Sequence, residues 1–191
     1  FDPNADGALS VAGSMKRKYP PWGVTALCKS EVRKKLHIIG DQNASRYIPC
    51  HNEIRIEQKA FSMPYEDLRR LYLQHKVYLN LSGSEGFGLT VYEAMKYGEI
   101  VVSPRLPAFE GLLDDADVMW VPVEGVGELD PWPYEYIEIF KYNGDALMEA
   151  AAKALEMSVE EREKIWCRNL HALQRTVGRS YDKLIKILHE E

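Results

Sequence analysis

Short apolar runs recur along the chain and alternate with longer segments of helical composition. The runs have the length of buried strands, at residues 8–13, 35–40, 54–56, 77–81, 100–104 and 118–122. The segments of helical composition between them lie at residues 22–34, 64–75 and 88–97. Strands and helices that alternate at these lengths form parallel sheets with helices on both faces. The pattern therefore predicts an α/β fold with an open, doubly wound parallel sheet.

The alternation ends after the last of these strands. Residues 124–143 mix prolines with acidic and aromatic residues, and we interpret them as an insertion or a lid. Residues 145–157 are rich in Ala and predict a helix. Ser158 and Glu161 have the spacing of a capping box, which starts another long helix, and residues 180–189 predict a last one.

Composition narrows the classes of protein to which the chain can belong. It has 191 residues, 46% of them hydrophobic, and a net charge of -5, which describes one domain with a sizeable core. The negative charge argues against nucleic acid as a partner, because nucleic-acid-binding proteins normally carry a basic face. No segment reaches the roughly 20 apolar residues of a transmembrane helix, so we expect none.

The cysteines and the first residue bear on the location of the protein. Cys28, Cys50 and Cys167 are widely spaced and odd in number, so we expect reduced thiols rather than a disulfide frame or a zinc site. Reduced thiols indicate a cytoplasmic protein. The chain begins at Phe1, without Met or a secretory signal, which is consistent with the later part of a longer polypeptide.

The segment between Ser84 and Met95 carries the candidate chemistry. It places two carboxylates, Glu85 and Glu93, eight positions apart across a glycine-rich loop that enters a helix. The strand at residues 77–81 delivers this loop to the carboxyl edge of the sheet, where open α/β sheets bind their ligands. The unit of strand, glycine loop and helix therefore predicts a ligand site.

The start of this helix is suited to an anion. The first amides of a helix lack internal partners and lie at the positive end of its dipole. Gly86 and Gly88 carry no side chain that would keep a phosphate from the amides of Gly88, Leu89 and Thr90. A diphosphate fits this description.

The two carboxylates extend the prediction beyond the phosphates. Glu93 lies in a largely apolar helix and needs a partner, because a buried carboxylate without one is costly. The helical rise places it roughly 6 Å from the anion site, which suits the hydroxyl pair of a ribose. Taken alone, the glycine loop is also compatible with an ordinary turn. Glu93 is likewise compatible with neutralising an internal Arg or Lys, and Glu85 with a solvated loop.

The whole segment resembles the signature of retaining GT-B glycosyltransferases, most closely glycosyltransferase family 4. That signature reads Glu-Gly-Phe-Gly-Leu, then Glu-Ala-Met and a Gly. Every residue of it is present here: Glu85, Gly86, Phe87, Gly88, Leu89, Glu93, Ala94, Met95 and Gly98. The resemblance covers most of residues 8–190. It implies that residues 1–191 form one Rossmann-like lobe, the C-terminal donor-binding domain, with C-terminal helices at residues 145–190.

The resemblance also implies roles for these residues. The amides of Gly88 to Thr90 hold the phosphates, Glu93 binds the ribose, and Glu85 orients the transferred sugar as the catalytic residue. The donor is a nucleotide diphosphate sugar, transferred with retention and without a metal or other cofactor. The acceptor lies mainly on an N-terminal lobe that this chain lacks, and any association with a membrane is expected through that lobe.

The loop after the first strand departs from the family pattern. The family carries Gly-Arg and then Lys-Gly there, and the two cations clamp the diphosphate. In this chain Gly13 matches, Ser14 replaces the Arg, and three cations follow, of which Arg17 and Lys18 are the candidates for phosphate contacts. A solvated basic loop is the alternative.

Other parts of the chain leave further questions open. Trp132, Tyr134 and Tyr136 either stack on an acceptor sugar or fill a small separate core, and we favour the core. The C-terminal helices of GT-B enzymes cross to the other lobe, which accounts for Trp166 and Tyr181. The isolated chain is expected to bind its donor weakly and to transfer little sugar.

Three alternatives to the donor-binding domain of a glycosyltransferase remain. The chain could be a non-catalytic sugar-nucleotide binding subunit that acts with a separate acceptor-binding chain. It could also be an epimerase or phosphorylase relative on the same fold, since fold alone does not decide function. A flavodoxin-like binding module fits least, because such a module does not need a carboxylate inside an apolar helix.

Overall fold

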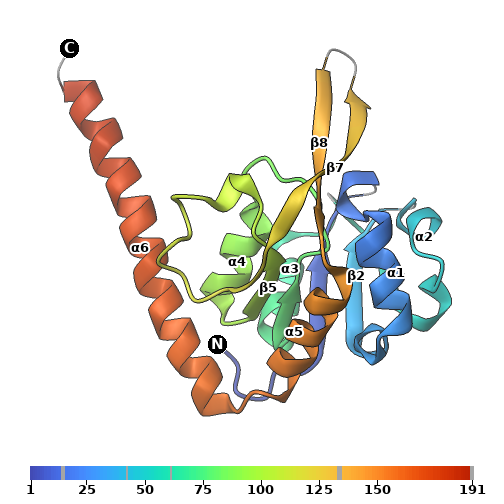
Figure 1. Ribbon diagram of the computed structural model, residues 1–191. Coiled ribbons are helices and arrows are strands. Elements are labelled where there is room, and N and C mark those ends of the chain that lie inside the picture. The colour runs from blue at the N-terminus through green and yellow to red at the C-terminus, as the bar shows by residue number, and fades with distance from the viewer. Residues whose placement is uncertain (14–15, 42, 61, 133–134, 190–191) are drawn as a thin grey trace.

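The computed structural model describes residues 1–13, 16–41, 43–60, 62–132 and 135–189 (Figure 1). Six strands form one parallel sheet in the order β3-β2-β1-β4-β5-β6. Their bounds are β1 Ala8–Val11, β2 Leu36–Gly40, β3 Arg55–Gln58, β4 Val77–Leu79, β5 Ile100–Pro104 and β6 Met119–Val121. The predicted open parallel sheet is confirmed, and each predicted strand corresponds to one of the six.

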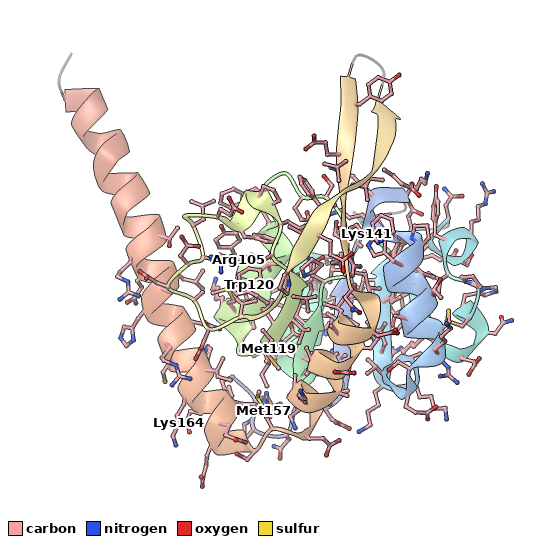
Figure 2. All side chains as sticks on the ribbon, in the orientation of Figure 1. Arg105, Met119, Trp120, Lys141, Met157 and Lys164 are labelled. Atoms are coloured by element: carbon pink, nitrogen blue, oxygen red, sulfur yellow. A yellow bond between two sulfur atoms is a disulfide. The ribbon has the colours of Figure 1, made fainter. Side chains whose placement is uncertain are left out.

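Successive residues of each strand point to opposite faces of the sheet, and each face carries its own hydrophobic cluster. In β2, Leu36 and Ile38 belong to the cluster that includes residues of α1 and α5, whereas Ile39 belongs to the cluster that includes residues of α3 and α4. Met119 and Trp120, neighbours in β6 (Figure 2), are divided in the same way. The sheet therefore lies between two layers of helices.

The helices match the predicted segments with one exception in this part of the chain. Four α-helices cover the sheet: α1 Pro21–Lys29, α3 Tyr65–Gln74, α4 Leu89–Tyr97 and α5 Gly144–Glu156. Shorter helical segments are η1 Lys16–Lys18, η2 Glu31–Lys35, α2 Ala44–Tyr47, η3 His51–Glu53 and η4 Pro107–Phe109. The helix predicted for residues 22–34 is divided at Ser30, because the Ser30 side chain accepts a hydrogen bond from the amide of Val32 and caps η2.

Helix α6 is longer than predicted. It runs without a break over Val159–His189 and packs along α4 (Figure 1). Ser158 and Glu161 form the predicted capping box, with hydrogen bonds from the Ser158 amide to Glu161 and from the Glu161 amide to Ser158. The prediction of a separate helix at residues 180–189 is wrong. The only glycine in this region, Gly178, costs about 1 kcal/mol in a helix, which is too little to end one.

The segment interpreted as an insertion or a lid forms an antiparallel hairpin. Its strands are β7 Val123–Trp132 and β8 Glu135–Tyr142, which stand out from the body of the molecule (Figure 1). Tyr136 is 71% exposed, so it does not fill a separate core, in contrast to our expectation. Residue 134 and the side chain of Trp132 lie outside the described part of the structure.

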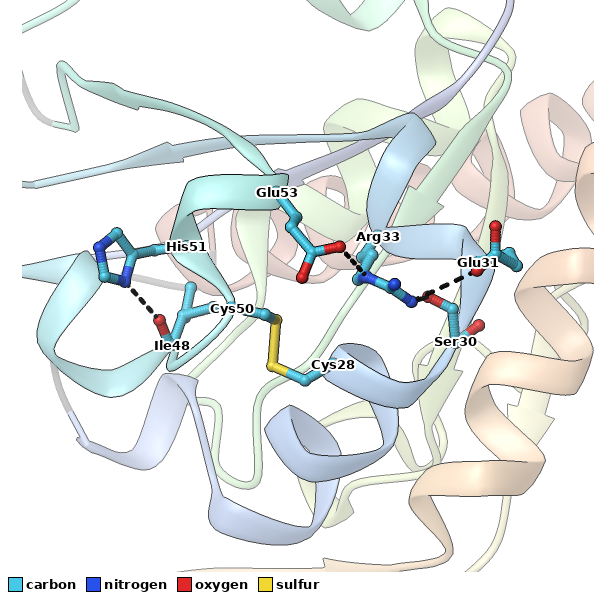
Figure 3. The surroundings of a disulfide bond; sticks show 8 residues. All are labelled: Cys28, Ser30, Glu31, Arg33, Ile48, Cys50, His51 and Glu53. Atoms are coloured by element: carbon cyan, nitrogen blue, oxygen red, sulfur yellow. Dashed lines mark hydrogen bonds and ion pairs between the residues drawn. A yellow bond between two sulfur atoms is a disulfide. The ribbon is translucent and has the colours of Figure 1, made fainter.

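A disulfide joins Cys28 of α1 to Cys50, with the two Cα atoms 5.5 Å apart (Figure 3). The expectation of reduced thiols is therefore wrong for this pair. The residues are 22 positions apart in sequence, but both pack against the same hydrophobic cluster on one face of the sheet. Cys167 is free and exposed. The cysteines no longer argue for a cytoplasmic location, which stays a prediction.

Helix α6 is also held by the N-terminal segment. The indole of Trp166 donates a 3.0 Å hydrogen bond to the carbonyl oxygen of Lys96, and its ring stacks on Phe1. Trp166 is thus explained by contacts within this chain, and the side chain of Tyr181 lies outside the described residues. In the described part of the chain, no helix combines the length and the apolar character needed to cross a membrane.

Candidate functional site

Two loops meet at the carboxyl edge of the sheet, between β1 and β4. The strand order reverses direction at these neighbouring strands, which makes this the topological switch point where open α/β sheets bind ligands. The loop after β1 contains η1, with Arg17 and Lys18, and the loop after β4 contains Glu85. The fold therefore brings together residues that are 67 positions apart in sequence.

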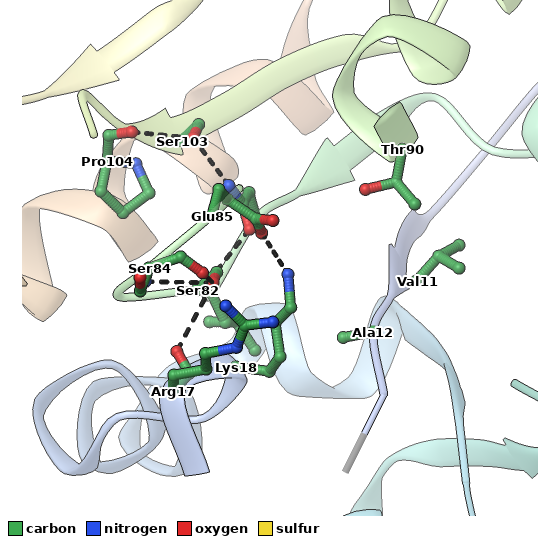
Figure 4. A network of polar contacts seen from close by, with 12 residues as sticks. Val11, Ala12, Arg17, Lys18, Ser82, Ser84, Glu85, Thr90, Ser103 and Pro104 are labelled. Carbon is green, nitrogen blue, oxygen red and sulfur yellow. Dashed lines mark hydrogen bonds and ion pairs between the residues drawn. The ribbon is translucent and has the colours of Figure 1, made fainter. Parts of the chain in front are cut away.

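Lys18 and Glu85 form the ion pair at the centre of this site (Figure 4). The Lys18 ammonium donates a hydrogen bond of 2.5 Å to Oε1 of Glu85. The side chains are only 16% and 8% exposed. A charge pair this far removed from solvent is not the solvated basic loop and solvated acid that the sequence left as alternatives.

A network of buried polar groups holds the loop that carries Glu85 (Figure 4). The Asn80 side chain accepts a hydrogen bond from the Ser82 amide at 3.1 Å and donates one to the Ser103 hydroxyl at 3.0 Å. The Ser82 hydroxyl then donates to the carbonyl oxygen of Ser84 at 2.6 Å. Asn80 thereby ties the loop to the end of β5, and the turn before Glu85 has little freedom to move.

The predicted N-terminus of α4 is present and carries no side-chain cap. Gly88 occupies the cap position with φ 75°, in the left-handed region that favours glycine, and Leu89 is the first helical residue. A Cβ at Gly88 would also lie 2.5 Å from the ring of Phe109. Gly88 is therefore required by the fold itself, whereas a Cβ at Gly86 would meet open space.

The remaining residues of the motif differ in exposure. Phe87 is 50% exposed and stacks on Tyr92, and Leu89 is 66% exposed. The Thr90 hydroxyl accepts a hydrogen bond of 2.7 Å from Tyr78, which also lies 3.2 Å from the carbonyl oxygen of Val11. Complete burial raises the pKa of Tyr78, so the phenol remains a donor to Thr90.

Glu93 lies on α4, in a groove of about 500 Å³ that Leu89, Tyr92 and residues of α6 also line. It accepts a 3.0 Å hydrogen bond from the hydroxyl of Tyr72 on α3. Burial is also the main cause that raises the pKa of Tyr72, and Glu93 adds to it. Within the described part of the chain, no Lys or Arg forms an ion pair with Glu93, so the salt-bridge alternative is not supported.

The residues predicted for the site in the loop after β1 differ in their positions and contacts. Gly13 is partly buried beyond the end of β1, and Ser14 lies outside the described residues. Arg17 is partly buried, and its Nε has no hydrogen-bond partner among the described residues. Lys16 points elsewhere, since it forms a 2.7 Å ion pair with Glu128 of β7. Of the three cations, Lys18 is thus the one that contacts Glu85.

Sequence reasoning missed Asn80, Ser82 and the two tyrosines that bond to the motif, Tyr72 and Tyr78. Asn80 carried a usable signal, because it is a polar residue in the otherwise apolar run at residues 77–81; in the structure it follows β4 and is only 5% exposed. Polar residues in such positions are normally paired. The tyrosines carried no such signal, because Tyr72 fits an amphipathic helix and Tyr78 fits a buried strand.

Comparison with known proteins agrees with this geometry. Residues 9–124 match the family described as Glycosyl transferases group 1. The chain belongs to this family. The matched segment includes β1 except for its first residue, β2 to β6, both loops of the site and the whole of α4. The site therefore lies entirely within the part of the chain that the family shares.

One relative of this chain is ORF330 of Acidianus filamentous virus 2, a protein provisionally named a glycosyltransferase. The two are 27% identical over 117 residues, which are 59% of this chain and 34% of the viral protein. The chain thus spans about a third of the length of this relative.

Solved structures of similar fold include a UDP-forming α,α-trehalose-phosphate synthase from Burkholderia xenovorans. It is 13% identical, with a TM-score of 0.67 over 97% of this chain and 44% of the synthase chain. The Anabaena protein Alr3699/HepE, solved in complex with UDP and glucose, is 15% identical, with a TM-score of 0.66 over 98% of this chain and 49% of that chain. These likenesses support the fold, one lobe of the GT-B type.

Proposed function

We propose that this chain is the donor-binding, C-terminal domain of a retaining glycosyltransferase of the family 4 type, which transfers a sugar from a nucleotide diphosphate without a metal. The observation that carries the proposal is the buried Lys18–Glu85 ion pair beside the uncapped N-terminus of α4. A cation and a helix N-terminus stabilise a leaving diphosphate in the way that a metal ion does elsewhere. Membership of the glycosyltransferase family and the UDP bound to a protein of the same fold support the choice of donor.

The ion pair suggests how the donor is received. In the proposed reaction, the diphosphate binds at the amides of Gly88, Leu89 and Thr90. The ammonium of Lys18 then pairs with the diphosphate instead of with Glu85. Glu85 is thereby released to accept hydrogen bonds from hydroxyl groups of the transferred sugar. Arg17, whose Nε has no partner in the described structure, supplies a second cation for the phosphates. Each charged group then exchanges one partner for another rather than losing one.

Glu93 is assigned to the ribose. Its carboxylate is partly exposed and accepts one hydrogen bond from the described residues, that of Tyr72, so it keeps acceptor capacity for further hydroxyl groups. Tyr72 fixes the orientation of the carboxylate, because its own hydroxyl is a donor that burial keeps protonated. The groove at Glu93 is open to a ligand that extends from the N-terminus of α4.

Transfer itself is expected to need a second lobe or a separate subunit that binds the acceptor. The chain spans less than half of the length of each of the relatives described above. In this view the isolated chain binds its donor and transfers little sugar. A transferase assay of the isolated chain that gives full turnover would contradict this part of the proposal.

Calorimetry with matched ligands tests the donor site. The isolated chain is titrated with UDP, GDP and ADP, with a nucleotide sugar of each base, and with inorganic pyrophosphate. We expect one base to be preferred, and the affinity for that nucleotide to fall about ten-fold or more in Lys18→Met. Lys153→Met, at an exposed lysine of α5, is the control and should bind like the wild type.

Two further variants separate the roles of the carboxylates. Glu85→Gln should weaken binding of the nucleotide sugar but not of the nucleotide. Glu93→Gln should weaken binding of the nucleotide but not of pyrophosphate, because pyrophosphate has no ribose. If none of these ligands binds to the wild type, the proposed function is wrong.

A further inference from the structure

The β7–β8 hairpin is in contact with both loops of the site, although it begins where the family match ends. That match covers residues 9–124, and the hairpin runs from Val123 to Tyr142. Its far end extends beyond the body of the molecule, whereas its base crosses the loops after β1 and β4 (Figure 1). The contacts of the base indicate that the hairpin has a role in the site.

Backbone hydrogen bonds connect the hairpin to both loops through a single residue, Gly83. The amide of Phe140 in β8 donates to the carbonyl oxygen of Gly83 at 2.8 Å. The amide of Gly83 donates to the carbonyl oxygen of Arg17 at 2.8 Å. Gly83 precedes Glu85 by two positions and Arg17 precedes Lys18 by one. The hairpin, the Glu85 loop and the Lys18 loop are thus linked in one run of backbone hydrogen bonds.

Packing at Gly83 leaves no room for a side chain. A Cβ at this position would lie 2.5 Å from Cγ2 of Ile139, which is 1% exposed. Gly83 is not among the glycines with positive φ, so its backbone would accept an alanine. Glycine is required here for the close approach of β8, not for the conformation of the turn.

Two more contacts hold the base of the hairpin in place. The hydroxyl of Tyr142 donates a 2.5 Å hydrogen bond to the carbonyl oxygen of Leu81, between β4 and the turn. Glu128 of β7 pairs with Lys16 at 2.7 Å, which ties the other strand to η1. Each strand of the hairpin is therefore bound to one of the two loops, in addition to the link through Gly83.

We propose that the β7–β8 hairpin is a positioning element of the donor site, which sets the distance between Lys18 and Glu85 by holding their two loops in register. The proposal rests on the proposed function for the identity of the ligand. Neither Ile139 nor Phe140 touches the donor in this scheme. They act through Gly83, and the carboxylate and the ammonium are brought together before the ligand arrives.

A double-substitution cycle between the turn and the hairpin tests this role. Gly83→Ala pushes the turn away from Ile139 and should weaken UDP binding, or binding of the preferred diphosphate, by about ten-fold or more. Ile139→Ala alone should weaken binding by no more than about three-fold. In the double variant the smaller residue 139 removes the closest contact of the new methyl group and leaves the carbonyl oxygen of Phe140 at 3.3 Å, so binding should recover most of the loss. Val126→Ala, at a 49% exposed position of the same hairpin, is the control and should bind like the wild type.

The melting temperature distinguishes positioning from stability. Ile139→Ala leaves a cavity in the core and should lower Tm substantially while binding changes little. Gly83→Ala should weaken binding most. If the loss of affinity follows the loss of Tm across the three variants, or if Gly83→Ala binds like the wild type, the hairpin has only a structural role and the proposal is wrong.

Hydrogen exchange tests the same role without any nucleotide. The amide of Ser84 bonds to the Ser82 hydroxyl, and the amide of Tyr19 bonds to the carbonyl oxygen of Lys16, one in each loop. Exchange at both amides should become about ten-fold faster in Gly83→Ala and return towards the wild-type rate in the double variant. Unchanged exchange in Gly83→Ala would refute the positioning role. A wild type that binds no nucleotide refutes the proposed function, and exchange then still decides the positioning role.

Discussion

Helix α4 has a glutamate near each end, and the two carboxylates differ in their surroundings. Glu85, before the N-terminus, is 8% exposed and paired with Lys18. Glu99, beyond the C-terminus, is 1% exposed, and neither of its carboxylate oxygens has a hydrogen-bond partner among the described residues. Arg162 of α6 is the cation that acts on Glu99, and it is itself 2% exposed.

The difference follows from the two edges of the sheet. At the carboxyl edge Glu85 has a cation as its direct partner, and in the proposed function a ligand replaces that partner. At the other edge α6 and the N-terminal segment cover Glu99, with Arg162 stacked on Phe1 and donating to the carbonyl oxygen of Asp2. Burial raises the pKa of Glu99, and Arg162 opposes that shift. A buried acid is therefore no sign of a ligand site unless the fold leaves it a way to exchange partners.

The largest expected effect is at the covered edge. Arg162→Met should lower the free energy of unfolding by about 3–5 kcal/mol, because it removes the hydrogen bond to the carbonyl oxygen of Asp2, the contact with the Phe1 ring and the charge that opposes the raised pKa of Glu99. Urea denaturation measures the loss, and Arg175→Met, at an exposed arginine of the same helix, is the control. Nucleotide affinity of the folded protein should not change. A loss of nucleotide affinity without a loss of stability would contradict the comparison, because Arg162 and Glu99 would then act on the ligand site and not on the fold.

The disulfide lies apart from both glutamates and gives the next largest effect. Replacing Cys28 and Cys50 by Ser should lower stability by about 3 kcal/mol, because the bond closes a loop of 22 positions. Thermal denaturation with and without a reductant measures the change, and Cys167→Ser is the control. Nucleotide affinity that falls together with stability here would show that the site depends on global stability and not on its own contacts.

At the carboxyl edge of the sheet the expected effect is on nucleotide binding. Lys18→Met should cost about 1.5–3 kcal/mol of binding free energy, since the proposed contact joins an ammonium to a phosphate. The substitution also leaves Glu85 without its cation, so stability should fall. Adding Glu85→Gln should restore the stability but not the binding, as calorimetry and denaturation of the same samples would reveal. Recovery of both would mean that Lys18 only neutralises Glu85.

The smallest expected effect is the pH dependence of stability that Glu99 causes. Its pKa in the folded state is raised above the ordinary value of 4.5, so the folded protein binds this proton more tightly than the unfolded chain does. Its contribution to stability is complete below pH 4.5 and is lost as the pH rises through the raised pKa. Glu99→Gln should therefore become more stable relative to the wild type as the pH rises. Denaturation at pH 4, 6 and 8 should show a growing difference, and a constant difference would contradict the raised pKa.

Much of the architecture could be predicted from local patterns. The helix predicted at residues 88–97 is α4, and the glycines that cap its two ends, Gly88 and Gly98, have left-handed backbones with φ 75° and 92°. The capping box at Ser158 was correct for the same reason, since it involves residues three positions apart. Local rules succeeded where the physical cause was also local.

Predictions failed where the cause was distant in sequence. Cys28 and Cys50 meet because both pack on one face of the sheet, and no spacing rule for cysteines contains that information. Tyr136 was expected in a core, but its strand runs along a hairpin that stands out from the body, where the side chain is exposed.

The sequence by itself determined the parallel sheet, the glycine loop with its two carboxylates, and the start of the helix that follows this loop. These depend on periodicity, backbone freedom and helix ends, which neighbouring residues decide. Only the tertiary structure decided that Lys18 is the cation that meets Glu85, that Glu93 is held by Tyr72, and that Gly83 is a glycine because Ile139 lies against it. Each of these facts depends on segments that become neighbours only when the sheet and the hairpin assemble.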